Sequence, residues 1–90
     1  MIRNFRHKGL KLLYDTGSGR LLAPTVVPKL EDLLSVLDVA TSLDDLHLPG
    51  LHPLKGRRRG ERAVTITANW RLVFRLCDGH VCDVDYEDYH

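Results

Sequence analysis

The chain has 90 residues, of which 43% are hydrophobic and 28% are charged, and its formal net charge is +1. This length allows one domain with a single modest core, in which roughly 60–65% of the unfolded surface becomes buried. No apolar run approaches the length of a membrane span, and the N-terminus lacks the long apolar stretch of a signal peptide. The composition is typical of a soluble globule and excludes a membrane-spanning protein. We expect a cytoplasmic location and no association with membranes.

The small net charge hides four blocks of alternating sign. Residues 1–29 carry six basic side chains and one acidic, and residues 55–75 carry seven basic and one acidic. Residues 30–54 and 76–90 each carry five acidic side chains and no basic one. Such blocks predict a cationic face and an anionic face, unless folding interleaves them and cancels the asymmetry.

Two helices are predicted in the first half of the chain. Residues 7–15 have apolar side chains at helical spacing, and Gly17 is a natural C-terminal stop. The second helix is expected to be capped by Thr25 and to carry one apolar stripe along its length. Ser42 with Asp45 three residues later resembles a capping box, which predicts a further short helix.

The second half of the chain changes to the two-residue period of β-strands. Residues 64–67, residues 70–76 and the segment after the Asp-Gly pair are expected to form antiparallel strands, with an N-terminal edge strand added. We therefore predict a single α+β domain over residues 1–90, in which two N-terminal helices pack on one face of a small antiparallel sheet. The other face, with Arg71 and Arg75, is expected to be open, polar and cationic.

Side-chain parity distinguishes two lengths for the last turn. A two-residue loop at residues 78–79 would bring Asp83 and Asp85 onto the apolar face of the sheet. A three-residue loop at residues 77–79 leaves both aspartates outside and brings apolar side chains opposite one another. Since a slip of one residue reverses every side chain, the longer loop is predicted.

The predicted register has two consequences for side chains near the turn. It pairs Trp70 with Tyr86, which makes Tyr86 the anchor of the last strand. It also places Cys77 and Cys82 on opposite faces, so no disulfide is expected. The two cysteines are interpreted as small buried side chains in a reducing compartment.

The most cationic segment lies between residues 51 and 62. It contains three consecutive arginines between two glycines, and Pro53 should keep His52 extended because the proline ring disfavours helix at the preceding residue. The run is either a solvated basic loop or a site for a polyanion, most simply the phosphates of a nucleic acid.

A group of other residues supplies what the cleavage of RNA without a metal requires. The reaction needs a base for the proton of the 2′-hydroxyl, cations for the phosphate charge, and an acid for the leaving 5′-oxygen. Histidine titrates near neutral pH, arginine binds phosphate through two donors, and tyrosine can stack on a base. Each candidate alone is as readily explained as a solvated side chain, and only their joint presence indicates chemistry. The candidates are His52, Lys55, Arg71, Asp88, Tyr89 and His90.

Four segments, in this order, resemble the HigB toxins of bacterial toxin–antitoxin systems, which belong to the RelE/ParE superfamily. They are the first thirteen residues, Leu-His-Pro-Leu-Lys-Gly at 51–56, Ala-Asn-Trp-Arg at 68–71, and Tyr-Glu-Asp-Tyr-His at 86–90. The resemblance covers essentially the whole chain, although residues 16–48 match only in pattern.

The resemblance implies a RelE-like fold and a ribosome-dependent endoribonuclease that cleaves mRNA in the ribosomal A site. It also implies a HigA-like helix-turn-helix antitoxin as partner, with contact with operator DNA only through the antitoxin complex. No acidic cluster with ligand spacing lies near the basic stretch, so we expect no metal and no cofactor. The family's catalytic positions match the six candidates named above. The arginine run is richer than the family pattern, and the candidate RNA-binding residues are Arg57, Arg58, Arg59, Arg62 and Arg75.

Two other functions remain open at this point. The first is a ParE-like toxin that inhibits DNA gyrase and does not cut RNA. The second is a chain that serves only as the antitoxin's partner in a repressor complex. The set of histidines, lysine, aspartate and tyrosine favours RNA cleavage, because neither alternative requires it.

The chain end needs its own prediction. A regular last strand would point Glu87 and Tyr89 to the side of Arg71 and would point His90 away from it. We therefore expect an irregular turn over the last three residues, with Arg71 or Lys55 paired to Asp88 or to the terminal carboxylate.

Overall fold

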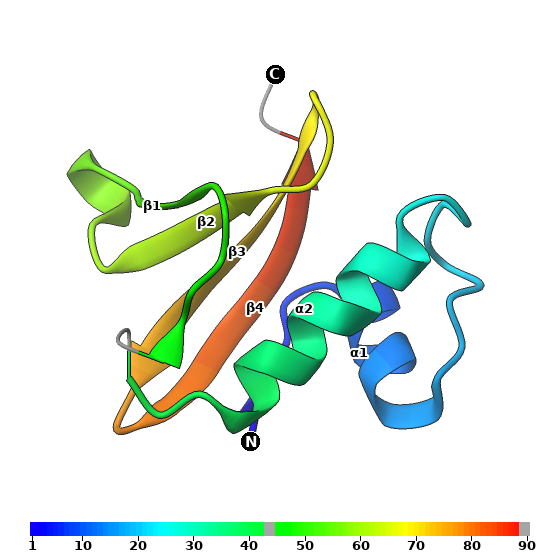
Figure 1. Cartoon of the computed structure of the whole chain (residues 1–90), viewed down its shortest axis with the longest axis horizontal. Helices are drawn as coiled ribbons and strands as arrows, with labels where there is room; N and C mark the ends of the chain where they lie inside the picture. The colour runs from blue at the N-terminus through cyan, green and yellow to red at the C-terminus, as the bar shows by residue number, and fades with distance from the viewer. Residues whose placement is uncertain (43–44, 89–90) are drawn as a thin grey trace.

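The computed structural model describes residues 1–42 and 45–88. Two helices, α1 (Lys8–Thr16) and α2 (Val27–Val39), cover one face of a four-stranded antiparallel sheet (Figure 1). The strands are β1 (Leu51–Pro53), β2 (Glu61–Thr65), β3 (Trp70–Cys77) and β4 (His80–Asp88), side by side in that order, and the short 3-10 helix η2 (Gly56–Arg58) follows β1. The predicted α+β fold with two helices on one face is confirmed. Within the described ranges, no helix is long and apolar enough to cross a membrane.

Both helices are held by an apolar stripe. α1 buries Leu10 and Leu13 and ends, as predicted, at Gly17, whose φ of 79° is left-handed. α2 buries four leucines against the sheet: Leu30, Leu33, Leu34 and Leu37. The predicted Thr25 cap is wrong, because the N-cap position belongs to Val26 and no side chain caps the helix there.

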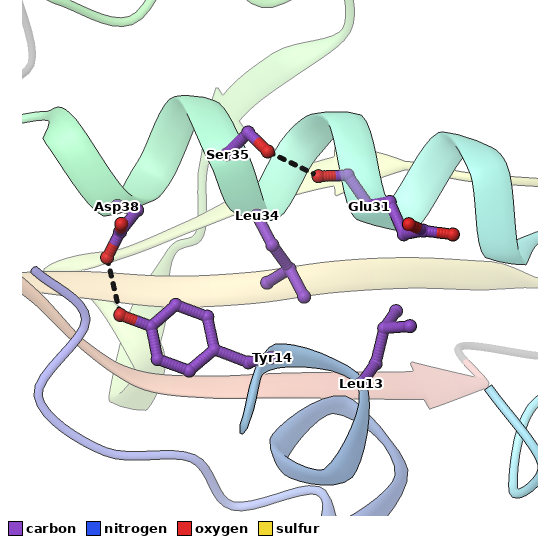
Figure 2. Close-up of a pocket in the computed structure, with 6 residues that line it drawn as sticks. All are labelled: Leu13, Tyr14, Glu31, Leu34, Ser35 and Asp38. Carbon is purple, nitrogen blue, oxygen red and sulfur yellow. Dashed lines mark hydrogen bonds between the residues drawn. The ribbon is translucent and has the colours of Figure 1, made fainter. Parts of the chain in front are cut away.

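Asp38 joins the two helices and the N-terminus. Its carboxylate accepts a hydrogen bond of 2.5 Å from the Tyr14 hydroxyl, which raises the pKa of Tyr14, and another of 3.3 Å from the backbone of Ile2. Figure 2 shows this contact at the edge of a groove of about 240 Å³ between the helices. The groove is lined by Leu13, Tyr14, Glu31, Leu34, Ser35 and Asp38.

The N-terminal segment lies along the free edge of β4, but it does not form the regular strand predicted for it. Single parallel bridges join Ile2 to Val81 and Phe5 to Val84, with backbone hydrogen bonds of 2.8 Å on either side of Asn4. The fourth strand of the sheet is instead β1. The segment therefore covers the edge of β4 with few ladder bonds.

The segment after α2 keeps part of its predicted cap. The carboxylate of Asp45 accepts from the backbone N–H groups of Thr41 and Ser42 at 2.9 and 3.2 Å. These bonds lower the pKa of Asp45. The short helix predicted here falls partly on residues 43 and 44, which lie outside the described residues.

The turn between β3 and β4 corrects the predicted register. Asp78 and Gly79, with φ of 51° and 78°, form a two-residue turn, so that Cys77 pairs with His80. Two left-handed residues in succession match the twist of a hairpin, and Asp-Gly is a preferred sequence for this turn. The predicted three-residue loop is therefore wrong.

A β-bulge resolves the parity conflict that had favoured the longer loop. The register shifts between Val73 and Arg75, so that Asp83 and Val84 together lie opposite Phe74. Asp83 takes a left-handed φ of 52°, which aspartate tolerates better than most residues. The bulge turns Val84 into the core and leaves Asp83 outside.

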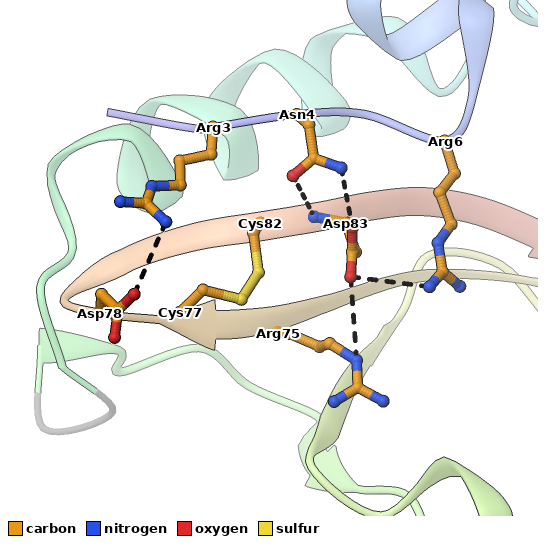
Figure 3. Close-up of a disulfide and its surroundings, with 8 residues drawn as sticks. All are labelled: Arg3, Asn4, Arg6, Arg75, Cys77, Asp78, Cys82 and Asp83. Atoms are coloured by element: carbon orange, nitrogen blue, oxygen red, sulfur yellow. Dashed lines mark hydrogen bonds and ion pairs between the residues drawn. A yellow bond between two sulfur atoms is a disulfide. The ribbon is translucent and has the colours of Figure 1, made fainter.

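The same turn brings the two cysteines together. Because Cys82 pairs with Arg75, and Cys77 lies two residues beyond Arg75, both cysteines project from the face opposite the helices. Their Cα atoms are 6.1 Å apart and a disulfide joins them (Figure 3). The expectation of two free thiols on opposite faces is therefore wrong, and its cause is the one-residue error in the turn.

Reduction of this disulfide is expected to lower the stability of the domain without changing its fold. The cross-link closes a loop of only a few residues, for which the entropy model gives about 2 kcal/mol, or a thermal midpoint lower by roughly 10 °C. Calorimetry with and without dithiothreitol measures the difference. The matched control is the double variant Cys77→Ser/Cys82→Ser, which should show the lower midpoint in both buffers. A midpoint that reductant leaves unchanged in the parent chain contradicts the expectation.

Candidate active site

The face of the sheet opposite the helices carries alternating residues of all four strands. One row across it joins His52, Ala63, Val73 and Asp85, and the next row towards the end of β4 joins Thr65, Arg71 and Glu87. His52 and Arg71 therefore lie on the same face in adjacent rows, two strands apart. The face is neither open nor simply cationic as predicted, because Ala63 and Val73 are fully buried and carboxylates lie among the arginines.

Arg58 of η2 covers this face. Its Nε donates to Glu61 Oε2 at 2.7 Å, and its Nη1 and Nη2 donate to the two oxygens of Glu87 at 2.6 and 3.1 Å. Because Glu61 and Glu87 lie on either side of the row containing Ala63 and Val73, the arginine bridges that row. This explains why both apolar side chains are buried although α1 and α2 lie on the opposite face.

The two glutamates bound by Arg58 also contact Arg71 and Arg6 of the N-terminal segment. Nε of Arg71 donates to Glu87 Oε1 at 2.8 Å, and its Nη2 forms an ion pair with the same oxygen at 2.7 Å. Glu61, only 4% exposed, also lies 3.8 Å from Arg6. We call Arg58, Glu61, Arg71 and Glu87 the four-residue network.

The network shifts the pKa values of two of its members. Hydrogen bonds from Arg58, and then from Arg71, hold the pKa of Glu87 below its usual range, although partial burial opposes the shift. The bonds to Glu87 and Glu61 raise the pKa of Arg58 further above its already high value. Both groups are therefore charged at neutral pH.

A second ion cluster holds the bulge. The side-chain amide of Asn4 donates from Nδ2 to Asp83 Oδ1 at 2.7 Å, and its Oδ1 accepts from the backbone N–H of Asp83 at 3.0 Å. Arg6 and Arg75 approach the other carboxylate oxygen at 3.6 and 3.9 Å (Figure 3). The left-handed residue of β4 is therefore fixed from both sides.

His52 is exposed and lies on the candidate face. Its Nδ1 is 2.9 Å from the carbonyl oxygen of Gly50. A carbonyl only accepts, so in the neutral ring Nδ1 carries the proton and Nε2 is the basic nitrogen. The residue thus presents a nitrogen that can take up a proton.

The remaining catalytic candidates are placed unevenly. Lys55 is exposed and immediately precedes η2, three residues before Arg58. Asp88 ends β4 opposite Trp70, at the same end of the sheet as Arg71. Tyr89 and His90 lie outside the described residues, as does most of the irregular turn predicted for the chain end. The structure therefore brings His52 and Arg71 onto one face, whereas Asp88, in register with Trp70 and one residue beyond Glu87, belongs to the other face of the sheet.

The five candidate RNA-binding arginines fall into different environments. Arg57 and Arg59 are exposed, whereas Arg58 between them is taken up by the network. Arg62 lies on the opposite face of β2 and donates to the backbone carbonyl of Glu61 at 3.3 Å, and Arg75 lies near Asp83. The three adjacent arginines of the sequence thus have two distinct surroundings.

The contribution of Glu61 and Glu87 was missed in the list of candidates. Parity did place Glu87 on the side of Arg71, which the structure confirms. Glu61, by contrast, stands inside a basic run and gave no sign that it would be buried. The feature that could have indicated its placement is its position two residues before the strand residue Ala63, which puts both side chains on the same face.

An aromatic cleft lies on the other face, near the end of β4. Trp70 stacks on Tyr86 with ring centroids 4.8 Å apart, and His7 meets Tyr86 edge-on at 5.7 Å. The predicted pairing of Trp70 with Tyr86 is wrong, because Trp70 pairs in register with Asp88 and Leu72 with Tyr86, but the two rings stack on one another. The cleft has a volume of about 320 Å³.

Across residues 1–42 and 45–88, no group of three or more His, Cys, Asp or Glu side chains is arranged to hold a metal ion. Cationic groups on the candidate face include Arg58, Arg71 and Arg75, and Lys55 lies just before η2. An arrangement of this kind suits an anion such as phosphate.

Residues 3–90 match the family described as the RelE-like toxin of type II toxin–antitoxin system HigB. The chain belongs to this family. A curated relative, Endoribonuclease HigB of Proteus vulgaris, is 41% identical over 92 residues, which cover all of both chains. As a member of a toxin–antitoxin family, the HigB-like chain has an antitoxin as its partner.

Two solved structures share the fold of this HigB-like toxin. A complex of YoeB with YefM from Staphylococcus aureus matches with a TM-score of 0.65 at 22% identity, covering 100% of this chain and 95% of that one. A mutant of YafQ from E. coli matches with a TM-score of 0.62 at 22% identity, covering 98% and 91%. The resemblance to HigB toxins inferred from the four sequence segments is confirmed.

Glu87→Gln is expected to change the pH dependence of stability. Because the folded-state pKa of Glu87 is depressed, its ion pairs stabilise the fold above the unfolded value near 4.5, and this contribution is lost as the pH falls through the lower folded value. At pH 7 the variant should be less stable by about 1 kcal/mol, a figure discounted for partial exposure. The difference should disappear in strong acid, where the parent carboxyl is also neutral.

Urea unfolding of both chains from pH 7 down to pH 2 measures this effect. The matched control is Glu31→Gln, the same chemical change on the exposed surface of α2, which should follow the parent curve at every pH. An unchanged gap between Glu87→Gln and the parent chain at pH 7 and pH 2 contradicts the assignment.

Proposed function

We propose that this HigB-like toxin is a ribosome-dependent endoribonuclease that cleaves mRNA in the ribosomal A site. The observation that carries the proposal is the common face of His52 and Arg71, with Asp88 ending β4 at the same end of the sheet as Arg71. The name of its 41% identical relative, an endoribonuclease, supports the same activity. The RelE-like fold of YafQ and YoeB is consistent with it.

The proposed reaction is metal-independent general acid/base catalysis. A base takes the proton of the 2′-hydroxyl, the 2′-oxygen attacks the neighbouring phosphorus, and the bond from phosphorus to the 5′-oxygen breaks. An acid gives a proton to that 5′-oxygen, which leaves a 2′,3′-cyclic phosphate on the upstream fragment. Nε2 of His52 is suited to proton transfer, and Arg71 and Lys55 stabilise the developing phosphate charge. Asp88, Tyr89 and His90 complete the proposed set, with base and acid left unassigned between the two histidines.

The proposed RNA contacts use cations outside the network. Arg57 and Arg59 are exposed on the loop next to Lys55 and suit backbone phosphates. Arg75 extends the cationic surface of the candidate face, Arg62 offers a contact from the other face of β2, and Arg58 supports the loop from beneath. The proposed partners are a HigA-like helix-turn-helix antitoxin, the ribosome and mRNA. We propose a cytoplasmic location and contact with operator DNA only through the antitoxin complex.

Cleavage should depend on the ribosome and on the attacking 2′-hydroxyl. His52 is exposed on a three-residue strand, so free RNA would meet an incompletely oriented site, and the ribosome would supply orientation. We expect cutting of mRNA on translating ribosomes and a rate lower by at least ~100-fold on the same RNA alone. An mRNA with 2′-deoxy at the scissile nucleotide should remain uncut on ribosomes.

Primer extension on the recovered mRNA measures these rates. Efficient cutting of naked RNA contradicts the ribosome requirement, and normal cutting of the 2′-deoxy substrate contradicts the mechanism. Gyrase-dependent DNA breaks in cells without any mRNA cutting would support the ParE-like alternative instead.

Deletion of His90 should abolish cleavage while leaving the thermal midpoint within about 2 °C of the parent, because a chain-terminal residue contributes little to the core. His52→Ala should likewise reduce cleavage strongly, since the side chain is exposed and its removal leaves no cavity. The control is His47→Ala, which removes an exposed histidine outside the sheet and leaves the candidate face intact. Toxicity in cells, mRNA cleavage and calorimetry are measured together. A folded deletion variant that remains fully toxic removes His90 from the mechanism.

A further inference from the structure

We propose that Arg58 and Glu87 are positioning residues of the reaction: they fix the guanidinium of Arg71 and tie the basic loop to the strand that leads into the chain end. This inference rests on the proposed function and extends it. Neither side chain is assigned contact with the reacting atoms. Their role is to hold the groups that make such contact.

The first argument is the use of the donors of Arg58. Three of its nitrogen atoms, Nε, Nη1 and Nη2, donate to carboxylates of Glu61 and Glu87 at distances between 2.6 and 3.4 Å. A guanidinium engaged by two carboxylates has little capacity left for a substrate phosphate. Arg57 and Arg59, which flank it, are exposed and can meet RNA. The arginine run therefore divides into two residues that face solvent and one that faces the protein.

The second argument is the orientation of Arg71. Its Nε and Nη2 converge on one oxygen of Glu87, and its side chain is 18% exposed. An arginine side chain has about 2 kcal/mol of rotamer entropy, much of which these bonds remove before the substrate binds. Glu87 is itself held by Arg58 through its two oxygens. Arg58 thus acts on Arg71 through a shared carboxylate.

The third argument is where the four network residues lie in the chain. Arg58 belongs to η2, Glu61 to β2, Arg71 to β3 and Glu87 to β4. Lys55 precedes η2 by one residue, and Glu87 immediately precedes Asp88 at the end of β4. One set of ion pairs therefore links the loop that carries Lys55 to the segment that leads to the proposed chain-end groups. Loss of the link should affect both parts of the site together.

The charge balance supports a positioning role over electrostatic attraction alone. Arg58 and Arg71 contribute two positive charges, and Glu61 and Glu87 contribute two negative ones, so the network adds no net charge to the face. Removing the charge of Glu87 would make the face more cationic and would favour RNA binding by simple attraction. The two roles therefore predict different results for Glu87→Gln. If Glu87 positions Arg71, kcat falls. If the face acts only by attracting RNA, kcat is unchanged and RNA binds more tightly.

The experiment measures kcat and KM for mRNA cleavage on programmed ribosomes, with calorimetry on every variant. Glu87→Gln should lower kcat by ~30–100-fold and change KM by no more than about threefold, since a misplaced group costs transition-state stabilisation. Arg58→Lys keeps the charge but lacks the two-pronged geometry, so it should not restore kcat relative to Arg58→Met. The double variant Arg58→Met/Glu87→Gln should be no slower than the slower single variant, because both act through Arg71.

Two controls separate positioning from other effects. Arg59→Met, in the same loop, should raise KM and reduce the salt dependence of binding by about one charge. Glu31→Gln on α2 should match the parent chain in every measurement. Parent-like kcat in a folded Glu87→Gln, or full rescue by Arg58→Lys, overturns the inference. If Glu87→Gln does not fold, the comparison of Arg58→Lys with Arg58→Met decides. A parent chain that cuts no mRNA on ribosomes contradicts the proposed function, which is a separate outcome.

Discussion

The β-bulge at Asp83 is the constraint on which both faces of the sheet depend. The two-residue turn before it starts β4 in a register that would turn its later apolar residues away from the helices. One additional residue in β4 reverses that parity, so that Val84 and Tyr86 enter the core and Glu87 emerges beside Arg71. A left-handed aspartate is costly by itself, and here Asn4, Arg6 and Arg75 fix it in place. The core and the charged face are therefore set by the same local distortion.

The charged face shows how the domain buries carboxylates without large penalty. Glu61 is almost entirely shielded from water, yet Arg58 and Arg6 lie close to it. A buried charge is tolerated when its hydrogen-bonding capacity is filled and an opposite charge is near. As a result, the ion pairs of Arg58 with Glu61 and Glu87 cover Ala63 and Val73 on the face opposite α1 and α2. The same ion pairs hold Arg71, so that support of the sheet and preparation of the proposed site are performed by one set of side chains.

The sequence predicted the elements better than their connections. Leucine spacing and Gly17 were sufficient for α1, and the leucine stripe was sufficient for α2, because each depends on local periodicity. The β3–β4 register was wrong because parity assumes uninterrupted strands, and the bulge depends on Asn4, a residue 79 positions earlier. The missed disulfide follows from the same error. His52 and Arg71 could be selected by residue type. The contact between Arg58 and Glu87 depends on how η2 lies against the sheet, and neither helical nor strand periodicity predicts that placement.

The pair of hydrogen bonds between Asn4 and Asp83 also has a consequence for the synthesis of the toxin. Its partners are separated by 79 residues, and the N-terminal segment can meet β4 only after that last strand has been made. Closure of so long a loop makes this contact one of the last that the nascent chain can form. Until β4 has been made, the bulge at Asp83 has no support from Asn4. A growing toxin chain therefore lacks its assembled charged face until its last strand has been synthesised.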